Sequence, residues 1–458
     1  MKHPQSICLL NDSFPPLIDG VANTVVNYAR NIEANGGCPV VVTPDVPGAD
    51  DSTFSYSVLR YPSLDTRKLV GYVAGYPFSP DVIRRLKEEN VQLLHSHCPF
   101  MSTVMARSLR EQLNAPLVMT YHTKFDIDIA KAVRGKLIQD RAIHLLAKNI
   151  SACDEVWVVS RGAGENLRSL GYEGEYIVME NGVDMPLGRV SDAEIAAATA
   201  EYDLPQGIPV YLFVGRMMWY KGLKIILDAL LQLQEQGKDF RMVFIGGGRD
   251  EVEVQEYAQR LGSKCIFTGP VCDREVLRAW YCRADLFLFP STYDTNGLVV
   301  REATACSLAS VLVADSCAAE GVSDWQNGFL IQENADSMAA VLTELYEEPE
   351  TVKRVGENAA RDLYISWEQA VRKAQERYEV VIDRYRSGGY PARNKISDEF
   401  WNMQGILMDK LSKVENIGEE IGTHLQENRQ ELKQLGRDVK EDLKDIRDAV
   451  WQKLDDYL

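Results

Sequence analysis

Ten short apolar runs separated by amphipathic segments constrain the fold of this chain more than any other feature of its sequence. Five runs lie in the first half, at 6–12, 38–44, 91–97, 116–122 and 154–160. Five more lie in the second half, at 209–215, 240–246, 264–269, 284–290 and 309–314. Their apolar residues are continuous, which is typical of parallel strands covered by helices on both faces. The alternation therefore predicts an α/β protein with two doubly wound domains.

Pro and Gly residues gather between the two sets of runs, in the stretch 186–208. Because these residues interrupt helices and strands, the stretch marks a domain boundary. We expect a first domain over 1–190 and a second over 206–375. The chain has 458 residues, which is too long for one hydrophobic core and agrees with two domains.

The sequence changes character after "RSGGYPARN" at 386–394. From 401 to 458 there is no Pro, and apolar residues recur at steps of three and four. This spacing predicts a helical extension over 395–458, either one long amphipathic helix or a helix pair. The segment is acidic, which favours a coiled coil or bundle over a membrane-surface helix, since lipid-binding helices are usually basic. The extension is a candidate for homo-oligomer formation.

Charge and composition exclude several classes of protein. The formal net charge is -17, so binding of nucleic acid through the whole surface is not expected. No apolar run approaches the roughly 18 residues of a membrane-spanning helix. The first residues enter a predicted strand directly and do not resemble a signal peptide. The nine cysteines form no C-x-x-C pair, which is typical of reduced thiols in a cytoplasmic protein.

The stretch "FVGRMMWYKG" at 213–222 is the first candidate site. Arg216 and Lys221 follow the end of a predicted strand, where ligands of doubly wound domains bind. An Arg fork and a Lys ammonium in such a turn suit a diphosphate. The alternative is a pair of solvated surface cations.

The stretch "STYDTNGLVVREATA" at 291–305 is the second candidate site. Gly297 and Leu298 begin a predicted helix whose free backbone N–H groups form an anion site. Glu302 lies about one turn into the helix, where a carboxylate suits the two hydroxyls of a ribose. Asp294, on the preceding loop, is placed to accept hydrogen bonds from a sugar. The alternative is an ordinary strand–turn–helix.

Two weaker candidates lie in the first half. Gly20 begins the first predicted helix and permits a phosphate or sugar to approach the backbone closely. His122, in "TYHT", ends a predicted strand that would point at a cleft between the two domains, although a lone His is often structural. "HSH" at 95–97 is interpreted as buried histidine, so no metal site is predicted.

Together these motifs resemble one family, the retaining family-4 glycosyltransferases with the GT-B fold. The resemblance covers roughly 6–385 and rests on Arg216, Lys221 and an acid-x7-Glu motif from Asp294 to Glu302. Supporting matches are "YHT" (121–123), "ENGVD" (180–184), "FIGGG" (244–248), "FTGPV" (267–271), "NGFLI" (327–331) and "SWEQA" (366–370). The sequence looks most like the branch that glycosylates membrane lipids, including diacylglycerol glucosyltransferases, sulfoquinovosyl transferases and phosphatidylinositol mannosyltransferases. It implies a GT-B fold in which a helix at 376–390 returns to the first domain.

The resemblance also implies an activity, which is transfer of a hexose from a nucleotide diphosphate sugar such as UDP-glucose to a membrane lipid such as diacylglycerol. The resemblance further implies that the product is an α-glycoside, that configuration is retained, and that no metal or cofactor is needed. Arg216 and Lys221 would bind the donor diphosphate and stabilise the leaving group. The other implied roles are ribose binding by Glu302, sugar and phosphate contacts by Asp294, Asn296, Gly297 and Leu298, closure by Gly20, and contact with the reacting sugar by His122.

Two departures from the family pattern are evident. Asp294 stands where the family usually has Glu, so its carboxylate is one methylene closer to the backbone. Ser307-Leu308-Ala309 and Ala318-Ala319 stand where the family tends to have Gly-Leu-Pro and a Gly pair. These changes leave open an inactive member that binds a sugar nucleotide or a partner without turnover.

The segment 124–148 is basic within an acidic protein. Lys131, Arg134, Lys136 and Arg141, interleaved with apolar residues, predict a helix that contacts an anionic membrane surface. The enzyme would then be peripheral on the inner face of the cell membrane. The alternative is a solvated helix over the acceptor cleft, and a soluble glycan or metabolite as acceptor.

Overall fold

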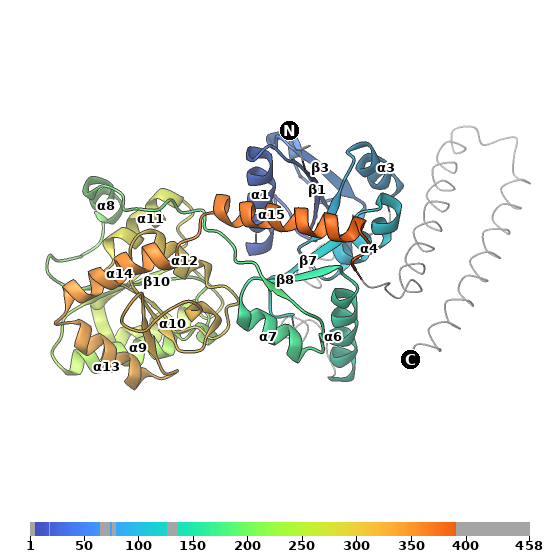
Figure 1. Ribbon diagram of the computed structural model, residues 1–458. Coiled ribbons are helices and arrows are strands. Elements are labelled where there is room, and N and C mark those ends of the chain that lie inside the picture. Colours follow the sequence, from blue (N-terminus) through green and yellow to red (C-terminus); the bar gives the residue numbers. More distant parts are fainter. Residues whose placement is uncertain (1–4, 18, 65–73, 76–78, 126–135, 391–458) are drawn as a thin grey trace, which may run out of the picture.

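The computed structural model describes residues 5–17, 19–64, 74–75, 79–125 and 136–390 (Figure 1). These residues form two domains, each built on a parallel sheet with helices on both faces, so the predicted fold class is confirmed. Lys131, Arg134 and the predicted extension at 395–458 lie outside the described residues.

The sheet of the first domain has seven strands in the order β3-β2-β1-β6-β7-β8-β9. All six of its strand pairs are parallel. Their bounds are β1 (Ser6–Leu10), β2 (Cys38–Pro44), β3 (Ser57–Tyr61), β6 (Leu93–Ser96), β7 (Leu117–Tyr121), β8 (Glu155–Val158) and β9 (Ile177–Val178). A small antiparallel pair, β4 (Ser63–Leu64) and β5 (Ala74–Gly75), stands beside this sheet. The strand order reverses between β1 and β6.

The sheet of the second domain has six parallel strands in the order β12-β11-β10-β13-β14-β15. Their bounds are β10 (Val210–Val214), β11 (Arg241–Ile245), β12 (Cys265–Gly269), β13 (Leu286–Phe289), β14 (Ser310–Val313) and β15 (Phe329–Ile331). Here the order reverses between β10 and β13. Such a switch point leaves a crevice beyond the carboxyl ends of the two strands, which is where doubly wound domains bind ligands.

Helices connect the strands in both domains. In the first they are α1 (Gly20–Ala34), α3 (Pro80–Glu88), α4 (Met101–Leu113), α6 (Lys136–Ser151) and α7 (Arg161–Ser169). In and before the second they are α8 (Asp192–Thr199), α9 (Leu223–Glu235), α10 (Glu251–Ala258), α11 (Arg274–Arg283), α12 (Leu298–Ala305), α13 (Ala335–Leu345) and α14 (Pro349–Leu363). Short 3-10 turns are η1 (Asp51–Thr53), η2 (Trp219–Lys221), η3 (Gln259–Lys264) and η4 (Cys317–Ala319).

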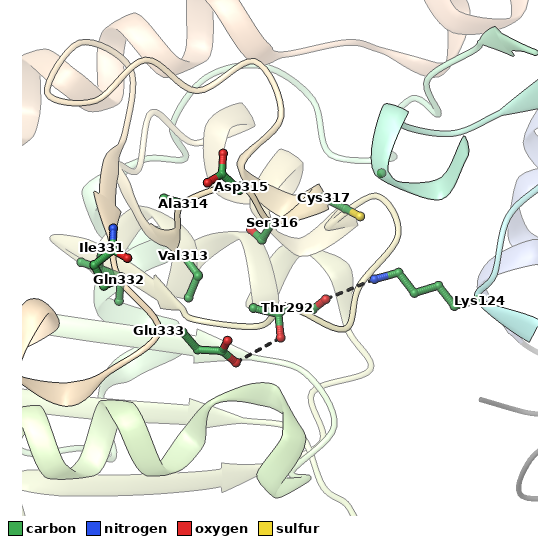
Figure 2. A pocket seen from close by; sticks show the side chains of 11 residues that line it. Lys124, Thr292, Val313, Ala314, Asp315, Ser316, Cys317, Ile331, Gln332 and Glu333 are labelled. Atoms are coloured by element: carbon green, nitrogen blue, oxygen red, sulfur yellow. Dashed lines mark hydrogen bonds between the residues drawn. The ribbon is translucent and has the colours of Figure 1, made fainter. Parts of the chain in front are cut away.

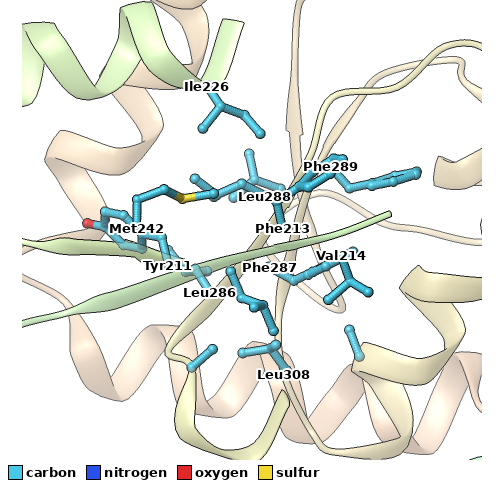
Figure 3. Packing of buried hydrophobic residues seen from close by; sticks show 14 of the residues in the cluster. Tyr211, Phe213, Val214, Ile226, Met242, Leu286, Phe287, Leu288, Phe289 and Leu308 are labelled. Carbon is cyan, nitrogen blue, oxygen red and sulfur yellow. The ribbon is translucent and has the colours of Figure 1, made fainter. Parts of the chain in front are cut away.

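The continuous apolar runs are buried on both faces of each sheet, as Figure 3 shows for the second domain. Every residue of β10 and of β13 is buried, and Phe213 and Phe289 of these strands stack with ring centroids 6.0 Å apart. This burial explains why the strands read as unbroken apolar runs and not as alternating ones. It also fixes the loops at their carboxyl ends on a rigid base.

The helix α15 (Trp367–Arg386) lies across the first domain although it follows the last helix of the second (Figure 1). The predicted returning helix at 376–390 overlaps its second half. Its start is set by a capping box, in which Ser366 and Gln369 bond each other's backbone N–H. Tyr378 stacks on Trp157 of β8 with ring centroids 5.3 Å apart. The chain therefore crosses twice between the domains, before α8 and before α15.

None of the described helices is long and apolar enough to cross a membrane. All nine cysteines are free thiols.

Candidate active site

The turns after β10 and β13 bring the two candidate motifs of the second domain together. Lys221 closes the 3-10 turn η2, and its ammonium lies 2.6 and 2.7 Å from the two carboxylate oxygens of Asp294. The Lys221 side chain is only 8% exposed and that of Asp294 is 24% exposed. The Ser291 hydroxyl also donates to Asp294, at 2.7 Å. Lys221 and Asp294, 73 residues apart in the chain, therefore form an ion pair at the switch point.

Arg216 lies on the same turn but is exposed, and no ion pair or hydrogen bond engages its guanidinium in the described part of the chain. Lys221, in contrast, is held in place by its ion pair with Asp294. A free guanidinium beside a fixed ammonium fits a ligand that supplies its own negative charge.

Gly297 adopts the left-handed conformation, with φ 55° and ψ 49°, immediately before α12. It offers no side chain to cap the helix, so the first N–H groups of α12 have no side-chain cap. A Cβ added at Gly297 would lie 3.0 Å from the Ala318 methyl group, which is closer than ordinary contact. Both the conformation and the space therefore require glycine, and the result is a positive helix end beside Lys221.

Asn296 is 9% exposed, and its buried side-chain nitrogen has no hydrogen-bond partner among the residues that the structure describes. Leaving a buried donor unpaired costs about 1–3 kcal/mol, so such groups in folded proteins call for an explanation. Its place next to Gly297 makes it a candidate contact for an anionic ligand.

Glu302 lies in α12 and is held by two residues of α11. Arg274 donates to one carboxylate oxygen at 2.9 Å, and the Tyr281 hydroxyl donates to the other at 2.9 Å. Burial, and then the negative charge of Glu302, raise the pKa of Tyr281 well above its ordinary value, so this hydroxyl stays a donor. Each carboxylate oxygen can accept a further bond, so Glu302 is oriented but not saturated.

The first domain approaches this site through α1. Gly20 opens the helix, and a Cβ added there would meet no atom of the described residues within 4 Å. Asp19 caps the helix by accepting from the N–H groups of Val21 and Ala22, both at 2.8 Å. Burial raises the pKa of Asp184, and the charge of Arg274 and the Asn27 side chain of α1 act against this rise.

His122 follows β7 and is 6% exposed. Its carbonyl accepts a hydrogen bond from the Thr295 hydroxyl at 2.6 Å, which places it directly against the loop that carries Asp294. The "HSH" histidines, His95 and His97, are buried as expected. No group of three metal-ligating side chains occurs in the described ranges.

Several contacts between the domains were missed by the sequence reasoning. The Ser160 hydroxyl donates to the Thr295 carbonyl, and the N–H groups of Arg161 and Gly162 donate to Glu320 at 2.7 and 2.6 Å. Ser160 also caps α7, and a Ser before a helical pattern was the one local signal available. Its partners lie more than 130 residues away, so no local pattern could reveal them.

A polar cavity of about 410 Å³ lies between the domains, next to the Asp294 loop (Figure 2). Lys124 of the first domain reaches across it and donates to the Thr292 carbonyl at 3.2 Å. The Thr292 hydroxyl in turn donates to Glu333 at 3.2 Å, after β15. The cavity shows that the two domains leave room for a ligand at the carboxyl ends of β14 and β15.

Ser307, Ala318 and Ala319 stand where the family tends to have glycine, and the structure shows their conformation and surroundings. Ser307 adopts a left-handed φ of 57°, which explains why glycine suits this position. Ala318 and Ala319 lie in η4 and are buried, and the Ala318 methyl group occupies space next to Gly297. Ala318 therefore borders the positive, N-terminal end of α12, whereas Ser307 follows its C-terminal end.

Two family models match the chain, one on each domain. The model described as Glycosyltransferase Family 4 matches residues 18–186. The model described as Glycosyl transferases group 1 matches residues 195–362. The chain is a glycosyltransferase with the GT-B fold.

The glycosyltransferase is 24% identical over 378 residues to the alpha-monoglucosyldiacylglycerol synthase of Acholeplasma laidlawii, covering 77% of this chain and 91% of the relative. It is also 24% identical over 401 residues to sulfoquinovosyl transferase SQD2 of Arabidopsis thaliana, covering 83% of this chain and 75% of the relative. The predicted resemblance to the glycolipid branch is confirmed. HepE of Anabaena in complex with UDP-glucose has the same fold, with a TM-score of 0.64 at 18% identity over 82% of this chain and 99% of that one.

Proposed function

We propose that this glycosyltransferase moves glucose from UDP-glucose to a membrane lipid such as diacylglycerol and forms an α-glycoside with retention of configuration. The observation that carries the proposal is the Lys221–Asp294 pair beside the uncapped start of α12, at the switch point of the second domain. The Acholeplasma laidlawii relative, an alpha-monoglucosyldiacylglycerol synthase, supports a lipid acceptor. The UDP-glucose complex of HepE supports the donor.

The donor diphosphate would lie between Lys221, Arg216 and the first N–H groups of α12. Negative charge is stabilised at all three, since two are cationic side chains and the third is a helix N-terminus. The Asn296 amide would gain the partner that it lacks. The ribose hydroxyls would donate to Glu302, which Arg274 and Tyr281 hold in place. The backbone at Gly20 would close on the donor from the first domain.

The proposed reaction exchanges one bond at C1 of the sugar for another on the same face. The bond from C1 to the diphosphate oxygen breaks, and the acceptor hydroxyl oxygen forms the new bond to C1. The hydroxyl proton passes to the departing diphosphate, so no protein base is required. Lys221, Arg216 and the α12 N–H groups stabilise the charge of the leaving group, which is an electrostatic form of catalysis. We propose that neither a metal ion nor a cofactor takes part.

The acceptor would arrive from a membrane surface at α4 and α6. On α6, Arg141, Leu145 and Lys148 follow one another at steps of four and three, so they share one face. Leu145 is 66% exposed, which is unusual for an apolar side chain between cations. Two more apolar residues are exposed at the start of α4, Phe100 at 39% and Met101 at 40%. Cations beside exposed apolar groups fit an anionic lipid surface.

Binding to vesicles that contain anionic lipid should weaken sharply with salt and on replacing Arg134, Lys136 and Arg141 by Ala. Each lost cation removes about 1 kcal/mol of attraction, so the triple variant should bind roughly 100-fold less tightly. Co-sedimentation with anionic and with neutral vesicles measures this. The matched control replaces Arg354, Arg361 and Arg372 by Ala. This removes the same amount of charge from α14 and α15 in place of the basic segment. Binding that is absent, or that salt does not change, would remove the membrane proposal.

The donor is tested by thermal shift against a panel of nucleotide sugars, followed by product analysis. A ligand at 100 times its dissociation constant stabilises the folded state by about 2.7 kcal/mol. We expect UDP-glucose to give the largest shift, and transfer to diacylglycerol in vesicles to give an α-glucoside. Transfer to soluble glycans or metabolites alone would contradict the lipid acceptor. Donor binding without turnover on any acceptor would indicate a non-catalytic protein.

A further inference from the structure

A second buried histidine, His97, lies next to His122. Its Nδ1 is 3.0 Å from Nε2 of His122. The two rings stack with centroids 5.2 Å apart and an interplanar angle of 20°. His97 is 1% exposed, so water does not compete for this contact. Nε2 of His122 is therefore engaged by His97, and Nδ1 is available to a ligand.

Both histidines are neutral near pH 7. Burial lowers the pKa of His97 well below its ordinary value, and the charges that His95 and His122 could carry lower it further. Burial also lowers the pKa of His122, to about 3. A neutral imidazole has one N–H donor and one lone pair. The hydrogen bond must then use the N–H of one ring and the lone pair of the other, which allows two arrangements.

The buried Nε2 of His97 distinguishes the two arrangements, because it has no hydrogen-bond partner within the described ranges. If His97 accepted at Nδ1, its own N–H would sit on Nε2 and remain buried without an acceptor. The neighbouring rings of Tyr28 and His95, with centroids 5.1 and 4.0 Å away, make no hydrogen bond to Nε2 among the described residues. Buried N–H groups without a partner are rare in folded proteins. The favoured arrangement has Nδ1–H of His97 donating to Nε2 of His122.

We infer that His97 fixes His122 in the tautomer that carries its proton on Nδ1, so that His122 offers the reacting sugar a hydrogen-bond donor and not a base. The inference rests on the proposed function for the role of His122, but not for the tautomer itself. Nδ1 of His122 has no hydrogen-bond partner in the described part of the chain, and the residue keeps an exposed fraction of 6%.

This tautomer has a consequence for the reaction. A Nδ1–H group can donate to a sugar hydroxyl or to oxygen that gains negative charge as the C1–O bond breaks. It cannot accept the proton of the acceptor, which agrees with transfer of that proton to the departing diphosphate. His97 is then a positioning residue, since it reaches the sugar only through the orientation of His122.

The tautomer can be read directly in the resting protein by long-range ¹H–¹⁵N correlation NMR with labelled histidine. The chain has six histidines, and the His122 signals are assigned by their loss in His122→Asn. We expect a protonated Nδ1 and a bare Nε2 at His122. A protonated Nε2 in the wild-type protein would overturn the inference. Because no donor or acceptor is present, this result does not depend on the proposed function.

Two variants then test the cause. His97→Phe keeps a ring but removes the donor, whereas His97→Asn keeps an N–H close to the position of Nδ1. In His97→Phe we expect the His122 proton to move to Nε2 or to exchange, and kcat to fall by up to about 100-fold, the effect of losing one donor at a transition state. His97→Asn should restore the Nδ1–H signal and most of kcat. An unchanged His122 tautomer in folded His97→Phe would refute the role of His97.

Discussion

Replacing Lys221 by Met should reduce glycosyl transfer by about 10³-fold, because one buried cation at the leaving group contributes electrostatic stabilisation of that order. Met matches the length of the Lys side chain without its charge. The variant should also lose the thermal shift that the donor produces. The protein should remain folded, since Asp294 is 24% exposed and keeps its hydrogen bond from Ser291. Steady-state kinetics and thermal shift with UDP-glucose measure both effects.

Lys224 provides the matched control, because it lies three residues further along the same segment. Its side chain is 61% exposed and pairs with Asp228 at 2.8 Å. Exposed pairs contribute about 0–1 kcal/mol, so Lys224→Met should leave transfer and the donor shift nearly unchanged. Equal losses in the two variants would mean that Lys221 acts only through folding or net charge, and would contradict its role in donor binding.

Replacing Gly297 by Ala should reduce transfer by about 100-fold, since a displacement of around 1 Å at a reacting group is enough for such a loss. The new methyl group would meet that of Ala318 at 3.0 Å, and the left-handed backbone would be strained. Both effects move the first N–H groups of α12 away from the donor. The left-handed conformation should also lower the free energy of unfolding, by about 1–2 kcal/mol. Thermal unfolding and transfer kinetics separate the two quantities.

Gly207 and Ala318 supply the controls for this prediction. Gly207 also has a positive φ, of 80°, but a Cβ there meets no described residue within 4 Å, so Gly207→Ala should cost stability without a loss of transfer. Adding Ala318→Gly to Gly297→Ala should recover much of the lost transfer, because the contact between the methyl groups disappears. Similar activity losses at 207 and 297 would show that the strain acts globally and not at the α12 start.

Several features of the site could be predicted because they depend on local sequence. Gly297 was recognised from a turn between a buried strand and a helix, and the structure adds the reason, which is the left-handed φ and the contact with Ala318. His122 was placed at a strand end, and it lies against the loop of Asp294. His95 and His97 were correctly expected to be buried. The tautomer of His122 was not predictable, because it depends on which atoms of His97 have partners.

The sequence by itself determined the two doubly wound domains, because burial on both faces of a parallel sheet imposes continuous apolar runs that can be read residue by residue. It also indicated that Lys221 and Asp294 follow strand ends, where ligands bind, and that Glu302 lies about one turn into the next helix. Only the tertiary structure decided how these groups are paired. It joins Lys221 to Asp294, Glu302 to Arg274 and Tyr281, and His122 to His97. These bonds link residues far apart in the chain, and distances of about 3 Å between such residues follow from packing of the whole fold and not from any local pattern.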